Sequence, residues 1–236
     1  RFVEMAKQAL KEITANGQIP IVVGGTGFYI QALLYDIDFT EQECDSAYRR
    51  QLEELAETRG NHYLHEMLKA VDPASAEAIH ENNRKRVIRA LEFYHESGER
   101  ISEHTERESQ KTSPYNFAYF VLNDDREKLY RRIDARVDAM VKAGLVDEVA
   151  RLQQMGCHAD MVSMQGLGYK EILDYLSGEI PLEEAVYILK RDTRHFAKRQ
   201  LTWFRRMEGA HWLDGSDPET LAKAQQLVER FLNGEL

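Results

Sequence analysis

The sequence predicts an α/β fold with a parallel sheet and an all-helical insertion, and three observations lead to that prediction. An apolar, β-branched run at residues 19–23 lies between two helical patterns, and such a run is typical of a strand that is buried on both faces of a parallel sheet. A glycine loop at residues 24–27 follows the run, the order typical of doubly wound folds. From about residue 41 to residue 105 strand patterns vanish and short helices dominate.

The first elements follow from periodicity and from helix stop signals. Residues 1–15 place apolar side chains at helical spacing, and Asn16 and Gly17 end that helix because both tolerate a left-handed backbone. No initiator Met and no N-cap residue precede the helix, so we expect the chain to begin inside a larger protein.

The predicted insertion is a series of helices, one of which starts with Asp72 as N-cap and Pro73 in its first turn. We expect residues 1–40 and 106–236 to form the α/β core and residues 41–105 to form the inserted domain. The helices predicted in the insertion cover residues 50–58 and 63–70, a segment from residue 72, and residues 84–96, with Gly98 as the final stop.

The pattern after the insertion returns to mixed α/β structure. Pro181 suits the first turn of a very long helix that runs to about residue 207. The predicted elements are strands at residues 117–122 and 211–213, and helices at residues 125–143, 145–155, 170–176, 181–207 and from residue 218 onward.

Composition places the chain among ordinary globular proteins, with 43% hydrophobic and 30% charged residues. No apolar run approaches the roughly 18–20 residues of a membrane span, and no signal peptide opens the chain. Cys44 and Cys157 form no CxxC pattern, and His62 and His65 have no third ligand at metal spacing. We therefore expect a cytoplasmic protein with no disulfide and no zinc site.

The net charge of −9 argues against a nucleic-acid partner, but the positive charges are unevenly distributed. Residues 190–206 carry a local charge of +6 and include Trp203 and Phe204. Basic residues interleaved with aromatics suit phosphates and stacked bases, although solvated helix faces remain an alternative. The clusters consist of Arg84, Lys85, Arg86 and Arg89; Arg131, Arg132 and Arg136; and Lys190, Arg191, Arg194, Lys198, Arg199, Arg205 and Arg206.

The loop at residues 24–27 could bring backbone N–H groups close to an anion at a helix N-terminus. It lacks the Lys-Ser/Thr pair of a Walker A loop, and a tight turn that merely needs glycine is the alternative reading. The hydroxyl of Thr26 adds a group that can bond a substrate.

Five stretches of the chain together resemble the tRNA dimethylallyltransferases (tRNA isopentenyltransferases). They occur in the family's order and span nearly the whole chain. The stretches are IPIVVGGTGFY at residues 19–29, NRKRVIRALE at 83–92, RIDARV at 132–137, GLGYKE at 166–171 and RHFAKRQLTWFR at 194–205.

This resemblance implies transfer of a dimethylallyl group from dimethylallyl diphosphate to N6 of the adenosine 3′-adjacent to the anticodon (position 37), with Mg²⁺ assisting. It also implies a P-loop-type sheet core. The family's P-loop and general-base Asp match no residue here; we expect both to lie upstream of Arg1 and this chain to be inactive by itself. We further expect a monomer that binds the tRNA anticodon stem-loop and no membrane.

The resemblance also assigns roles to individual residues. Thr26, Arg132 and Arg136 match positions at the reaction centre, and the two arginines would hold the diphosphate. Relatives carry arginine at the position of Gln165, which is a departure in this sequence. The residues implied for tRNA binding are Thr26, Arg49, Lys85, Arg86, Arg89, Gln165, Tyr169, Lys170, Arg194, Lys198, Arg199, Gln200, Trp203 and Arg205.

Two other functions are compatible with the residues. A P-loop kinase-like phosphotransferase acting on a small molecule would use the basic helix as a lid. A non-catalytic RNA-binding module would need only the basic surfaces. A GxxxxGKT motif followed by Asp-Ser in the upstream gene sequence would favour an enzyme over a binding module.

Overall fold

The computed structural model describes residues 1–37 and 46–235, and it shows a mostly helical α/β chain with a small parallel sheet. The chain divides into two compact units, and each unit has its own buried core. Unit 1 comprises Arg1–Gly24 and Phe28–Tyr115, and unit 2 comprises Gly25–Gly27 and Asn116–Leu236. The predicted domain boundary at residues 40 and 41 and the side chain of Cys44 lie outside the described residues.

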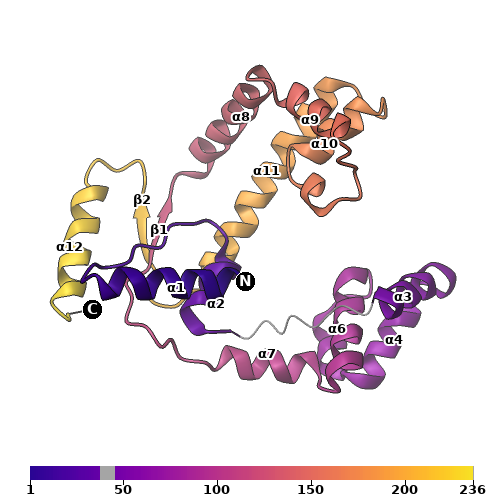
Figure 1. The fold of residues 1–236 in the computed structure, drawn as a ribbon, viewed down its shortest axis with the longest axis horizontal. Helices are drawn as coiled ribbons and strands as arrows, with labels where there is room; N and C mark the ends of the chain where they lie inside the picture. Colours follow the sequence, from indigo (N-terminus) through magenta and orange to yellow (C-terminus); the bar gives the residue numbers. More distant parts are fainter. Residues whose placement is uncertain (38–45, 236) are drawn as a thin grey trace. The chain divides into compact units, whose positions relative to one another are not determined.

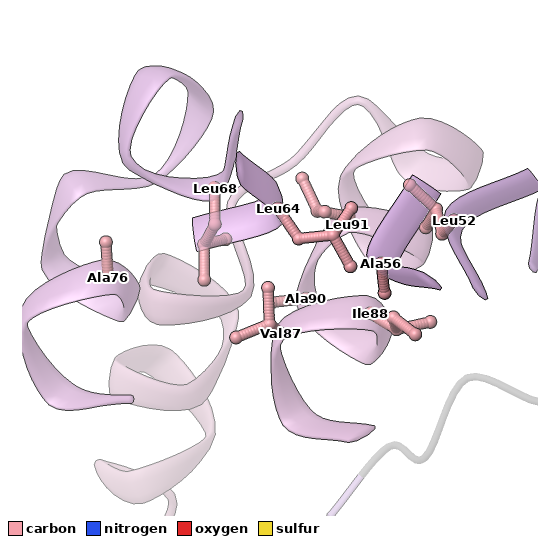
Figure 2. Packing of buried hydrophobic residues seen from close by; sticks show 9 residues of the cluster. All are labelled: Leu52, Ala56, Leu64, Leu68, Ala76, Val87, Ile88, Ala90 and Leu91. Atoms are coloured by element: carbon pink, nitrogen blue, oxygen red, sulfur yellow. The ribbon is translucent and has the colours of Figure 1, made fainter. Parts of the chain in front are cut away.

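Most of unit 1 is a bundle of short helices, as predicted for the insertion. Leu64 and Leu68 of α4 pack with Val87, Ile88 and Leu91 of α6 in a core that Figure 2 shows from close by. Each of these side chains is buried because it lies on the apolar stripe of its helix. The helices are α3 (Ser46–Arg59), α4 (Asn61–Val71), α5 (Pro73–Ala78), α6 (Arg84–Ser97) and α7 (Ile101–Ser109).

The stop and start signals of this bundle function as the sequence predicts. Asp72 caps α5 with Pro73 in the first turn, and Gly98 ends α6 in the left-handed conformation. The Asp72 carboxylate, which is 1% exposed, also accepts hydrogen bonds from Ser102 N at 3.0 Å and Ser102 Oγ at 2.7 Å. One buried carboxylate therefore holds the starts of two helices, α5 and α7, the second of which the sequence did not predict.

The remainder of unit 1 contains α1 (Phe2–Ala15) and α2 (Gly27–Tyr35), whose first residue belongs to unit 2. The rings of Phe2 and Tyr29 stack at 4.6 Å, and Lys7 pairs with Asp36. The strand predicted at residues 19–23 is wrong for this structure, since these residues form no strand and Ile21 and Val23 are 84% and 90% exposed. A strand needs a hydrogen-bonded neighbour, and none of the described residues pairs with this run.

Unit 2 contains the sheet and the longest helix. Strands β1 (Phe120–Asn123) and β2 (His211–Asp214) pair in parallel, with Val121 opposite Trp212, close to where the sequence predicts strands. Four helices lie between the two strands in the chain, and a last helix follows them (Figure 1). These are α8 (Arg126–Lys142), α9 (Leu145–Gln154), α10 (Tyr169–Leu176), α11 (Leu182–Phe204) and α12 (Thr220–Leu232), with a 3-10 turn at Val162–Gln165.

The core of unit 2 lies among α8, α9, α10 and α11. Val149, Ile172 and Ala185 are fully buried there, and Val137 and Leu189 are nearly so. The core fixes one face of α11 against α8 and α10, and the rest of that helix is available for polar contacts. No helix in the described ranges is long and apolar enough to cross a bilayer.

Candidate functional site: a glycine loop and a basic helix end

Unit 2 brings the loop at Gly25–Gly27 onto the C-terminal half of α11. The Gln200 side-chain amide donates a hydrogen bond to the Gly25 carbonyl oxygen. A Cβ added to Gly27 would lie closer than 3.0 Å to three atoms of the Trp203 indole, and a Cβ on Gly25 would meet the Gln200 amide as closely. Neither glycine has a positive φ, so close approach to the rigid indole, and not turn geometry, requires glycine at position 27, whereas at Gly25 the flexible Gln200 side chain could move aside.

Thr26 lies between these two glycines. Gly27 is buried, whereas Thr26 is exposed, so the loop is fixed while the threonine faces solvent. The structure thus places Thr26 beside a helix that carries basic side chains in its last turns.

The first half of the basic cluster on α11 is neutralised within unit 2. Lys190 Nζ lies 2.6 Å from Asp138 Oδ1, and Arg194 Nη1 donates to Asp134 Oδ1 at 2.5 Å. Both carboxylates come from α8. The two acids are spaced i, i+4 on α8 and the two bases are spaced i, i+4 on α11, so the two ion pairs lie one helical turn apart between neighbouring helices. Arg194 therefore has a packing role in this structure, and its predicted contact with tRNA remains a prediction.

The second half of the cluster remains exposed. Lys198, Arg199 and Arg205 are exposed, as is Arg206, and none of these four forms an ion pair within residues 1–37 and 46–235. The Arg199 guanidinium lies 5.9 Å from the centre of the Phe196 ring. The positive charge that α11 offers to a partner is thus concentrated at the end that also holds the glycine loop.

Arg132 and Arg136 lie one turn apart on the exposed surface of α8. Arg132 is 73% exposed and its Nη1 lies 3.2 Å from Oδ2 of Asp124, a carboxylate only 9% exposed. Both arginines are exposed, and their predicted contact with the diphosphate stays a prediction. Their predicted convergence with Thr26 stays a prediction.

Unit 1 holds a second set of predicted residues. Arg49 donates from Nε and Nη2 to the two oxygens of Glu92, at 2.8 and 2.7 Å. Glu92 is fully buried, whereas the Arg49 side chain is 42% exposed. The nearby Tyr48 has a raised pKa because of burial and, second, the charge of Glu92. Arg49 is thus fixed by a buried carboxylate while its side chain reaches the surface.

A groove of about 480 Å³ opens beside Arg49 on the helical bundle. Arg84 donates from Nη2 to the Glu53 carbonyl oxygen at 2.6 Å, which fixes α6 against α3 at the groove wall. Lys85 and Arg86 are exposed and Arg89 is half-buried. The groove is lined by Arg49, Glu53, Glu57, Arg84, Lys85 and Ile88.

Three further residues predicted to bind tRNA have partners inside unit 2. Gln165 donates its amide to the Ala159 carbonyl oxygen, and the Tyr169 hydroxyl donates to Glu148. That hydrogen bond, followed by burial and the charge of Glu148, raises the pKa of Tyr169. Lys170 Nζ lies 3.3 Å from Glu171 and 3.5 Å from Asp192. These contacts hold the glycine-containing turn against α9 and α11.

No group of three or more His, Cys, Asp or Glu side chains that could hold a metal ion comes together in the described ranges. We therefore assign no step of the chemistry to a metal held by these residues. Cys157 is a half-buried free thiol.

Sequence reasoning missed the acids that neutralise the clusters. Asp134 and Asp138 share one face of α8 at i, i+4, and Lys190 and Arg194 share one face of α11 at the same spacing. That matched spacing is a signal for a helix pair that the sequence contains. Glu92, in contrast, has no local signal, because its partner lies 43 residues earlier.

The fold and the site define a class: an α/β protein that presents a loop hydroxyl and exposed arginines suited to a polyanion. Comparison with known proteins specifies that class further. Residues 1–207 match the family model described as IPP transferase, so the chain belongs to that family. A tRNA dimethylallyltransferase of Lachnoclostridium phytofermentans is 59% identical over 217 residues, which cover 92% of this chain and 69% of the relative. One of Acetivibrio thermocellus is 53% identical, with 98% and 74% covered.

Solved structures give the same result. The tRNA isopentenylpyrophosphate transferase of Bacillus halodurans is 38% identical and superposes with a TM-score of 0.67, covering 99% of this chain and 73% of that one. A eukaryotic dimethylallyltransferase acting on tRNA is 28% identical with a TM-score of 0.76, covering 100% and 62%.

Proposed function

We propose that this protein transfers a dimethylallyl group from dimethylallyl diphosphate to tRNA, at N6 of the adenosine 3′-adjacent to the anticodon. The enzyme activity follows from the family and from relatives named for it. The position of the target base and its recognition through the anticodon stem-loop are what the resemblance to the family implies, and the exposed basic side chains suit such an RNA partner.

The chemistry explains why these residue types are needed. The N6 lone pair attacks the allylic carbon, the carbon–oxygen bond to the diphosphate breaks, and the diphosphate leaves with the electron pair. The N6 proton then passes to a base. Charge develops on the leaving group, and exposed guanidinium groups such as those of Arg132 and Arg136 suit it because they remain charged and donate paired hydrogen bonds.

One observation supports this proposal above the others: Thr26 lies in a fixed loop on the end of α11 where Lys198, Arg199, Arg205 and Arg206 are exposed. A base brought to Thr26 would carry its neighbouring phosphates toward these cations. The target base must leave its stack to react, and the Gly25–Gly27 loop, which presents the exposed Thr26, is suited to receive it.

The helical unit has a basic surface of its own that suits RNA. Lys85 and Arg86 are exposed on α6, and Arg49 reaches the groove that Lys85 also lines. We propose that this surface contacts the tRNA, with Arg89 as a half-buried supporting cation. The P-loop-type sheet core, the assistance of Mg²⁺, a monomeric state and a cytoplasmic location complete the proposal as expectations from the family.

The test is prenyl transfer by the protein expressed from its complete gene. Labelled dimethylallyl diphosphate is incubated with an anticodon stem-loop that carries adenosine at the target, and with a matched stem-loop carrying purine riboside, which lacks N6. We expect label only in the first RNA. Phosphate transfer from ATP to a small molecule would support the kinase-like alternative instead, and tight RNA binding without any transfer would support a binding module.

A further inference from the structure

We infer that Gln200 and Trp203 are positioning residues that clamp the Gly25–Gly27 loop and so set the place of Thr26. The inference deepens the proposed function and rests on it. It reassigns two residues that the sequence comparison implies for RNA contact. In the sequence both side chains lie within a basic stretch, which by itself favours direct contact with RNA.

The contacts that support the inference are polar on one side and steric on the other. The Gln200 amide donates to the Gly25 carbonyl oxygen, and the Trp203 indole packs so closely on Gly27 that no Cβ fits between them. Gln200 and Trp203 are spaced i, i+3, so they form one face of α11, and both are half-buried. Their neighbours Lys198, Arg199 and Arg205 are exposed.

The division of labour along α11 follows from this arrangement. The exposed cations suit a phosphate backbone, whereas the half-buried face is already occupied by the loop. Because Thr26 lies between two glycines that contact α11, its backbone is held against the helix that carries these cations before any RNA binds. Such fixed placement lowers the entropic cost of aligning the reacting groups, and a shift of about 1 Å can cost about a hundredfold in rate.

Gly24 provides a matched control within the same loop. A Cβ added to Gly24 would meet nothing within 4 Å, and its φ is not positive, so alanine fits there. Gly27→Ala, in contrast, forces the indole of Trp203 or the loop to move. Trp203→Ala removes every indole atom that a Cβ on Gly27 would meet, so the double variant Gly27→Ala/Trp203→Ala tests whether this contact is responsible.

The first readout needs no activity: hydrogen exchange, by mass spectrometry, of the peptide that spans residues 25–35. We expect faster exchange in Gly27→Ala and in Gln200→Glu, whose carboxylate cannot donate to Gly25. Gly24→Ala should exchange like the parent protein. Equal exchange in all variants would overturn the clamp, whatever the chemistry of the site.

The second readout is steady-state prenyl transfer by the protein expressed from its complete gene. Gln200→Glu should lower kcat by roughly tenfold or more and leave KM for the stem-loop within about twofold. Gln200→Lys, which retains a donor, should recover part of kcat, and the double variant should be no slower than Gly27→Ala alone. A raised KM with unchanged kcat would overturn the inference and return Gln200 to RNA binding. If the parent transferred no prenyl group, the proposed function would fail, while the exchange result would still decide the clamp.

Discussion

The Arg49–Glu92 pair allows the predicted RNA-binding role of Arg49 to be separated from its role in folding. Arg49→Ala removes two hydrogen bonds of 2.8 and 2.7 Å from a carboxylate that is fully buried. Breaking a buried pair from one side costs about 3–5 kcal/mol. The Arg49 side chain is 42% exposed, so water can partly replace it, and we expect the free energy of unfolding to fall by roughly 2–3 kcal/mol.

Urea denaturation followed by far-UV circular dichroism measures this change. Arg86→Ala is the matched control, because Arg86 is exposed on the same helix as Glu92, and its effect should stay within about 0.5 kcal/mol. Arg49→Lys retains the charge but not the paired geometry and should cost less than Arg49→Ala. If Arg49→Ala were as stable as the parent protein, Glu92 would not depend on Arg49 and the argument from burial would be refuted.

Three further predictions concern the helix cap Asp72, the contact between Asp134 of α8 and Arg194 of α11, and the exposed Arg199. Burial raises the pKa of Asp72, but hydrogen bonds from Ser75 and Ser102 outweigh burial and lower that pKa below its ordinary value. The Asp72 carboxylate therefore contributes its full stabilisation above the pKa of the unfolded chain, and this stabilisation is lost as the pH falls through the pKa of the folded protein. Asp72→Asn should accordingly lower the urea midpoint at pH 7 and lose less stability than the parent protein on going to pH 3, and an unchanged acid limb would contradict this. Asp134→Asn, which weakens the contact with Arg194, should lower the free energy of unfolding by about 1 kcal/mol, checked by the urea midpoint. Arg199→Ala should weaken stem-loop binding in fluorescence anisotropy and reduce the salt slope by roughly one, and an unchanged slope would mark Arg199 as an ordinary solvated side chain.

Local signals in the sequence predicted much of the fold. The caps at Asp72 and Gly98 and the apolar stripe of α6 are properties of neighbouring residues, and the structure confirms them. Helix α7 was missed because Ile101–Ser109 is dominated by polar and charged residues and its cap comes from Asp72, 30 residues away. The strand at residues 19–23 was predicted from β-branched composition, but pairing requires a partner that composition cannot supply.

The candidate site was predictable to a similar degree. The sequence identifies Thr26 and the basic residues of α11, and the structure places them in one unit. The pairing of Lys190 and Arg194 was missed because Asp138 and Asp134 lie more than 50 residues earlier, and their matched i, i+4 spacing is informative only once α8 and α11 are known to pack together. The local charge of +6 therefore overestimates the positive charge that the first half of α11 offers to a partner. The folded structure separates the paired cations, such as Lys190 and Arg194, from the exposed ones, such as Lys198 and Arg199.

The most direct test of the central claim is to locate the prenyl group on transfer RNA treated with the protein expressed from its complete gene and dimethylallyl diphosphate. Nuclease digestion and mass spectrometry should place one dimethylallyl group on N6 of the adenosine directly 3′ of the anticodon. A prenyl group on any other nucleoside, or RNA that returns unmodified, would contradict the account.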